Sequence, residues 1–208
     1  MCARALTELS YIGTRPYIRG ADLYAWFERQ IAGSLPPDRR PVAVRQFRLV
    51  NEVARDGSWC EGAVGNASAT LDVVDGDDRA QRYSFCETGD LISRRAPDIP
   101  SNLRSLARSG DFAGTTVLAA PRDTTDLLNG LVEANKWLHA ETLVTRGLPA
   151  DRIRLIFIEN LPARVQAAGD CLAEFRHLGE RKAADRVYTL NAVSLGGGGD
   201  ALRICYSY

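Results

Sequence analysis

The chain has 208 residues, of which 45% are hydrophobic and 25% are charged, and its 26 basic residues balance its 26 acidic ones. This composition is typical of a folded protein with one large domain or two small ones, and it excludes wholesale disorder. The balanced charge argues against nucleic-acid binding, and no stretch approaches the roughly 18 apolar residues of a membrane helix. Because residues 1–11 lack the apolar segment of a secretory signal, the sequence predicts a cytoplasmic protein without membrane association.

The five cysteines predict neither a metal site nor a reactive centre. They form no Cys-x-x-Cys pair and no Cys/His spacing of the kind that zinc sites use. Four of them fall in strand-like segments, where free cysteine commonly packs as a small buried hydrophobe. We therefore expect no metal and no cofactor. The cysteines are Cys2, Cys60, Cys86, Cys171 and Cys205.

The first half of the chain predicts a short β segment at residues 6–12, a helix at 21–32 and then several strands. Asp75-Gly76-Asp77-Asp78 is typical of a hairpin turn between two of these strands. The predicted strands are residues 42–53, 63–74 and 82–87.

Residues 91–110 are predicted to form a linker between a first domain at 1–90 and a second at 111–208. Pro97 and Pro100 interrupt regular structure in this segment. A short helix is expected at 101–109.

The second half predicts the same order of elements, with a β segment at 115–119, a helix at 131–144 and four strands. Gly196 to Gly199 form a flexible turn before the last strand. This glycine tract is not a phosphate loop, because neither Lys-Ser/Thr nor a helix follows it. The predicted strands are residues 154–158, 170–178, 186–194 and 201–206.

An internal repeat relates the two halves. Leu35-Pro36-Pro37-Asp38-Arg39 recurs as Leu148-Pro149-Ala150-Asp151-Arg152, with a helix before each copy and a β-rich run after it. Such self-similarity indicates a duplicated unit. The aligned pairs are Asp22 with Glu133, Trp26 with Trp137, and Cys60 with Cys171.

The repeat and the order of elements resemble the hotdog superfamily, and specifically its fused double-hotdog members. The resemblance implies an α+β fold in which two antiparallel sheets each wrap around a central helix. Because an open sheet edge must be covered or paired, the two halves are expected to pair as a monomeric pseudodimer. A ferredoxin-like duplication is the alternative, but it requires a second long helix in each half, and the sequence predicts none.

The resemblance also implies the substrates, which are acyl groups carried as thioesters on coenzyme A or acyl carrier protein. Pro16 and Gly20 loosely resemble the Pro-x-x-x-Gly helix start of hotdog dehydratases, but the expected catalytic histidine is missing. Only His139 and His177 exist, and both are interpreted as structural or surface residues. Dehydration of the usual design is therefore not favoured.

Thioester hydrolysis demands less of histidine, because a carboxylate can activate water while amide donors polarise the carbonyl. Glu133 is the candidate carboxylate, and Asn129 lies one helical turn before it on the same face. The Gly130 N–H is expected to help to hold the oxyanion. In the alternative interpretation Asn129 caps the helix and Glu133 is a solvated residue near its positive end.

Further candidate residues precede or begin the first helix. Asp22 is the counterpart of Glu133 and a candidate catalytic residue of a second, pseudo-symmetric site. Arg15, Tyr17 and Arg19 stand just before it, where guanidinium groups could hold a phosphate of the carrier. Surface ion pairs are the alternative for these arginines.

Three functions remain open after the sequence alone. The first is an acyl-thioester enzyme, most simply a thioesterase. The second is a noncatalytic module that binds acyl groups or another ligand, and the third is a dehydratase, conjugate-addition or acyl-transfer enzyme on the same scaffold. Acyl chain length, the carrier and the number of active sites are not predicted.

Overall fold

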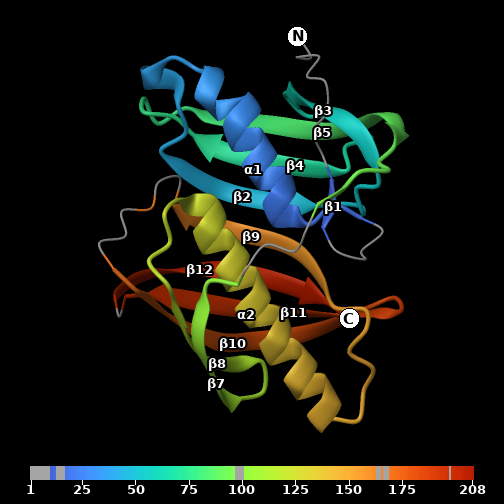
Figure 1. Cartoon of the computed structure of the whole chain (residues 1–208), viewed down its shortest axis with the longest axis vertical. Coiled ribbons are helices and arrows are strands. Elements are labelled where there is room, and N and C mark those ends of the chain that lie inside the picture. Colours follow the sequence, from blue (N-terminus) through green and yellow to red (C-terminus); the bar gives the residue numbers. More distant parts are fainter. Residues whose placement is uncertain (1–9, 13–16, 97–100, 163–164, 166–168, 197) are drawn as a thin grey trace. The chain divides into compact units, whose positions relative to one another are not determined.

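The structure is a computed structural model that describes residues 10–12, 17–96, 101–162, 165, 169–196 and 198–208. The chain divides into two compact units (Figure 1). The first comprises Met1–Pro100 and Leu161–Ala163, and the second comprises Ser101–Asn160 and Arg164–Tyr208.

The first unit packs helix α1 (Gly20–Gln30) on antiparallel strands in the order β3-β5-β4-β2. Two short 3-10 turns, Ala32–Ser34 and Pro37–Arg39, follow the helix, and β1 (Tyr11–Ile12) pairs in parallel with β6 (Arg95–Ala96). The strands of the sheet are β2 (Ala43–Leu49), β3 (Arg55–Glu61), β4 (Ala69–Val74) and β5 (Ala80–Leu91).

Aromatic side chains form the core of the first unit. Trp26 and Phe27 of α1 are each 1% exposed. The Trp26 ring meets Phe85 edge to face at 5.6 Å, and the Phe27 ring meets Trp59 in the same way at 5.3 Å. Such edge-to-face pairs add to the free energy that burial of the rings contributes.

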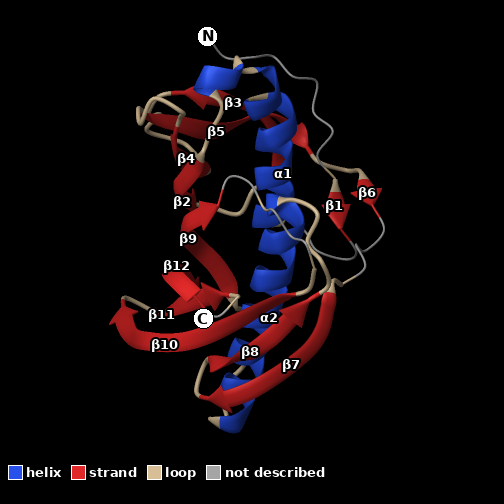
Figure 2. Cartoon of the chain, turned by 90° about the vertical axis from the view of Figure 1, so that its left-hand side faces the viewer, coloured by secondary structure: helices blue, strands red, loops and turns tan. Residues whose placement is uncertain are grey.

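The second unit packs the longer helix α2 (Thr124–Thr145) on antiparallel strands in the order β9-β12-β11-β10-β8-β7. In Figure 2 the sheet of this unit curves around α2. Buried positions recur every three or four residues along α2 and form one face, which packs on the sheet. The strands are β7 (Leu103–Gly110), β8 (Ala113–Leu118), β9 (Arg154–Pro162), β10 (Cys171–Ala183), β11 (Arg186–Leu195) and β12 (Gly198–Ser207).

The predicted α+β class, the two helices and the antiparallel pairing are confirmed. The helix expected at 101–109 is wrong, because Leu103–Gly110 is strand β7 and forms a hairpin with β8. The strand Arg55–Glu61 was not predicted, since Gly57 and Ser58 weaken its β character. Of the β segment predicted at 6–12, residues 10–12 lie in the described part, and Tyr11–Ile12 form strand β1.

The cysteine predictions hold in part. Cys86, Cys171 and Cys205 are not disulfide-bonded, and burial raises the pKa of Cys86 and of Cys171. Cys60, in contrast, is disulfide-bonded. It also lies near the end of its strand, whereas Cys171 begins one, so these two cysteines do not occupy equivalent positions.

Neither α1 nor α2 combines the length and the apolar character that crossing a bilayer requires, and these are the two α-helices of the described residues.

Candidate functional site

Helix α2 begins at Thr124, earlier than predicted, and this moves the expected site into the body of the helix. Asp123 is the N-cap, and its carboxylate accepts a hydrogen bond of 2.7 Å from a backbone N–H of the first turn. Asn129 is therefore not a cap. Gly130 lies nearly two turns into the helix, where its N–H belongs to the helical hydrogen-bond ladder, so the expected oxyanion contact lacks a free donor.

Gly130 instead allows α2 to approach the sheet closely. A Cβ atom at this position would lie 2.6 Å from Asn102 Oδ1 and 2.7 Å from Leu118 Cδ2. Asn102 also donates a hydrogen bond of 3.0 Å from Nδ2 to the Asp126 carbonyl. The glycine and the Asn102 amide together fix the first turns of α2 on strand β8.

Asn129 and Glu133 are neighbours on the surface of α2, because they lie four residues apart in one continuous helix. Glu133 is exposed and Asn129 is half-buried. Neither side chain has a hydrogen-bond or ion-pair partner among the residues that the structure describes. The pair is thus open to water and to a ligand, and its expected position opposite residues 15–22 stays a prediction.

Two of the residues predicted at the start of the first helix, Arg19 and Asp22, form an ion pair. Arg19 binds the Asp22 carboxylate through two bonds, of 2.8 Å from Nε and 2.7 Å from Nη2. This two-bond ion pair balances the charge of the carboxylate. It also engages the guanidinium that was expected to hold a phosphate. Tyr17 is half-buried, and Arg15 lies outside the described residues. The predicted substrate-binding role of these residues remains a prediction.

A buried polar network on the inner face of α2 was not predicted. Asn191 of β11 donates from Nδ2 to Asn135 Oδ1 at 2.7 Å and to the Phe112 carbonyl at 2.8 Å. Both asparagines are fully buried. Thr142 accepts a hydrogen bond of 2.9 Å from the Phe112 N–H. The network therefore ties the β7–β8 hairpin to both the helix and the sheet.

His139 lies in this network and is held in its neutral form. Nδ1 donates to the Asn135 carbonyl at 2.8 Å, and Nε2 accepts from the Thr189 hydroxyl. Burial lowers the pKa of His139 from 6.5 to about 4, assisted by the charge of His177 and opposed by the Asn135 carbonyl. Because both ring nitrogens are engaged and the residue is only 1% exposed, His139 cannot remove a substrate proton. Its interpretation as a structural histidine is consistent with this geometry.

The periodicity of the sequence contains a signal for this network. Asn135, His139 and Thr142 fall on the apolar face of α2, and Thr189 and Asn191 share the inner face of β11 with Val193. Polar residues at core positions of two neighbouring elements indicate a buried hydrogen-bond network, because such groups are seldom left unpaired.

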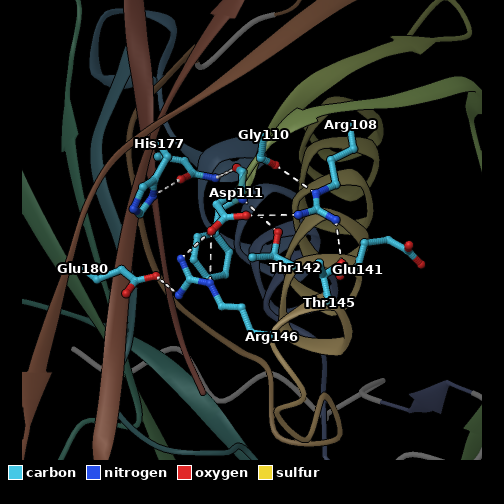
Figure 3. Close-up of polar contacts among 11 residues, drawn as sticks. Arg108, Gly110, Asp111, Glu141, Thr142, Thr145, Arg146, His177 and Glu180 are labelled. Carbon is cyan, nitrogen blue, oxygen red and sulfur yellow. Dashed lines mark hydrogen bonds and ion pairs between the residues drawn. The ribbon is translucent and has the colours of Figure 1, made fainter.

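Charged residues surround the network at the end of α2 (Figure 3). Arg146 binds Asp111 at 2.7 Å and Glu180 at 2.6 Å, and its guanidinium lies 4.8 Å from the centre of the Phe112 ring. The neighbouring guanidinium groups of Arg146 and Arg108 lower the pKa of Asp111. These opposite charges compensate one another, so the cluster is not an anion site.

No group of three His, Cys, Asp or Glu side chains is arranged to hold a metal ion within the described ranges.

No family model matches the sequence, and no curated protein matches it either. Solved structures do. A protein of unknown function with a hot dog fold from Alicyclobacillus acidocaldarius is 12% identical, with a TM-score of 0.46, over 92% of this chain and 86% of that one. A 12:0-ACP thioesterase from Umbellularia californica is 12% identical, with a TM-score of 0.43, over 94% and 88%.

The dehydratase domain of PpsC from Mycobacterium tuberculosis, solved with C12:1-CoA, is 10% identical with a TM-score of 0.42, over 92% of this chain and 84% of that one. Likenesses at this level say nothing about the reaction of this chain. The antiparallel sheet that curves around a long helix is itself the hotdog architecture. The predicted hotdog fold is thus confirmed.

Proposed function

We propose that this chain, which has the hotdog fold, is a double-hotdog protein that processes acyl thioesters, and that its reaction is hydrolysis. The substrate would be an acyl group on coenzyme A or on acyl carrier protein. The cytoplasmic location and the monomeric pseudodimer are parts of the same proposal.

The observation that carries this proposal is the pairing of Glu133 with Asn129 on α2. Within the part of the chain that the structure describes, Glu133 has an exposed carboxylate with no hydrogen-bond or ion-pair partner, one helical turn from the half-buried amide of Asn129. In the proposed reaction Glu133 removes a proton from water while the water oxygen attacks the thioester carbonyl carbon. Asn129 donates a hydrogen bond to the carbonyl oxygen, and the departing thiolate takes up the proton.

The exposure of Glu133 also favours a second candidate, a module that binds acyl groups without catalysis. A catalytic base usually lies in a site that excludes water, whereas Glu133 is exposed. In that case the fold would retain a ligand site and the chain would release no thiol. Dehydration through His139 is not proposed, since both of its ring nitrogens are engaged.

Release of free thiol from a panel of acyl-CoA and acyl-carrier thioesters, followed together with intact mass, tests the proposal. We expect hydrolysis by the natural chain, and a decrease of about 100-fold or more in turnover for Glu133→Gln, which removes the base at nearly constant volume. Glu141→Gln is the matched control, because Glu141 is another exposed carboxylate on α2. Full turnover in Glu133→Gln would reject Glu133 as the base, and binding without thiol release would favour the noncatalytic module.

A further inference from the structure

The hydrogen bonds of Asn191 determine which nitrogen of His177 carries the proton. His177 Nδ1 lies 3.2 Å from Asn191 Oδ1, while Asn191 Nδ2 is committed to the Phe112 carbonyl and to Asn135 Oδ1. A reversed amide would place its oxygen against two other oxygens, so the orientation is determined by its partners. Asn191 Oδ1 therefore accepts, and His177 Nδ1 must donate. In the neutral ring, the lone pair then lies on Nε2.

His177 Nε2 is accessible, in contrast to the nitrogens of His139. His177 is half-buried, and within the described ranges nothing forms a hydrogen bond with its Nε2. His139 is 1% exposed and uses both nitrogens. Since the chain has only 2 histidines, His177 is its one imidazole with a lone pair open to a ligand.

Two backbone irregularities lie beside the His177 ring. Strand β10 has a bulge between His177 and Gly179, and bulges commonly re-aim a side chain beside a functional site. Phe112 packs against the imidazole with 5.1 Å between ring centres, and its backbone has a φ of 53°, which is rare for a bulky residue. Such strain persists only where the surroundings impose it. Here the Phe112 N–H donates to Thr142, and the Phe112 carbonyl accepts from Asn191.

We propose that His177 is the general base of a second hydrolytic site, which lies in the second unit and is separate from Glu133. Nε2 removes a proton from water while the water oxygen bonds to the carbonyl carbon of an ester or thioester. The bond from that carbon to sulfur or oxygen breaks, and the leaving group takes the proton from the imidazolium. Asn191 is a positioning residue, since its Oδ1 accepts the Nδ1–H bond in both states of the ring. The acyl substrate class rests on the proposed function, whereas the accessible base does not.

Carbethoxylation of the folded chain with diethyl pyrocarbonate, which requires an unprotonated imidazole nitrogen, tests the accessible lone pair directly. Peptide mapping by mass spectrometry should find His177 modified at least about tenfold faster than His139. Both histidines should react after unfolding. Equal rates in the folded chain, or faster reaction at His139, would overturn the inference.

Hydrolysis of p-nitrophenyl acetate tests the catalytic role without a choice of acyl carrier. We expect His177→Gln to lower the rate at least about tenfold at an unchanged melting temperature. Arg176→Gln, an exposed neighbour on β10, should leave the rate unchanged. An unchanged rate in His177→Gln, or no rate above buffer in the natural chain, would overturn the role of His177. The proposed function fails separately, through the thioester panel and Glu133→Gln.

Asn191→Asp tests the positioning role through the pH–rate profile. A carboxylate against Nδ1 favours the imidazolium, so the rise of the rate with pH should move to higher pH. Phe112, which packs against His177, also contacts the titratable or charged groups His139, Arg146 and Tyr208, and Arg146 in turn binds Asp111 and Glu180. The substitution leaves these groups in place but removes the bonds that Asn191 Nδ2 donates to the Phe112 carbonyl and to Asn135 Oδ1, so the melting temperature is measured alongside. An unchanged profile in a folded variant would show that Asn191 does not act through His177.

Discussion

The two helices each bury one face against strands, but the side chains on these faces differ in chemistry. Helix α1 buries Trp26 and Phe27 among aromatic rings of its sheet. Helix α2 buries Asn135 and His139, which form hydrogen bonds with each other and with strand β11. An aromatic core tolerates many arrangements of similar volume, whereas a buried polar network requires every partner in place.

The largest expected effect comes from replacing Trp26 or its aligned partner Trp137. The two losses of unfolding free energy should differ, although the repeat aligns the two residues. Trp26 is 1% exposed and Trp137 is only half-buried. Trp26→Ala should lower the free energy of unfolding by about 4 kcal/mol, and Trp137→Ala by about 1 kcal/mol, in urea denaturation. Equal losses would show that the two helices bury equivalent faces after all.

The next effect concerns acid stability and is specific to the second unit. His139 has its ordinary pKa of 6.5 in the unfolded chain, whereas its pKa in the folded chain is about 4. The neutral His139 therefore stabilises the folded chain fully above pH 6.5. As the pH falls toward 4 this stabilisation is lost, and the free energy of unfolding decreases by about 3 kcal/mol. Urea denaturation across this pH range should give a shallower dependence for His139→Gln than for the natural chain. Identical slopes would contradict a buried, neutral imidazole.

The smallest expected effect is the difference in stability lost when the N-cap residue of α1 or of α2 is replaced. Asp123 caps α2 through its side chain, whereas the N-cap of α1, Arg19, forms no such capping bond. Asp123→Ala should cost about 1 kcal/mol of unfolding free energy. Arg19→Ala should cost about 0.5 kcal/mol, the typical value of an ion pair at the surface. Thermal melting of both variants measures the difference, and Asn129→Ala is the control, since Asn129 is not a cap. A larger loss for Asn129→Ala than for Asp123→Ala would contradict the observed start of α2.

Local patterns in the sequence determined the main elements of this protein. Apolar periodicity predicted both helices, and alternation with turn signals predicted most strands, because these patterns follow from the geometry of each element alone. The four-residue spacing of Asn129 and Glu133 likewise placed them together as soon as the helix formed. The repeated Leu-Pro-x-Asp-Arg segment predicted a duplicated unit, and the domain bounds drawn from it stay a prediction.

Tertiary structure decided what local patterns could not. The segment Leu103–Gly110 forms a strand because β8 supplies its hydrogen-bond partners, and no local signal contains those partners. Likewise, the sequence does not show that Glu133 points to water, that Arg19 engages Asp22, or that Asn191 leaves a lone pair on His177. Each of these outcomes depends on side chains that are distant in the chain or on the rotation of a helix about its axis, which only packing against the sheet determines.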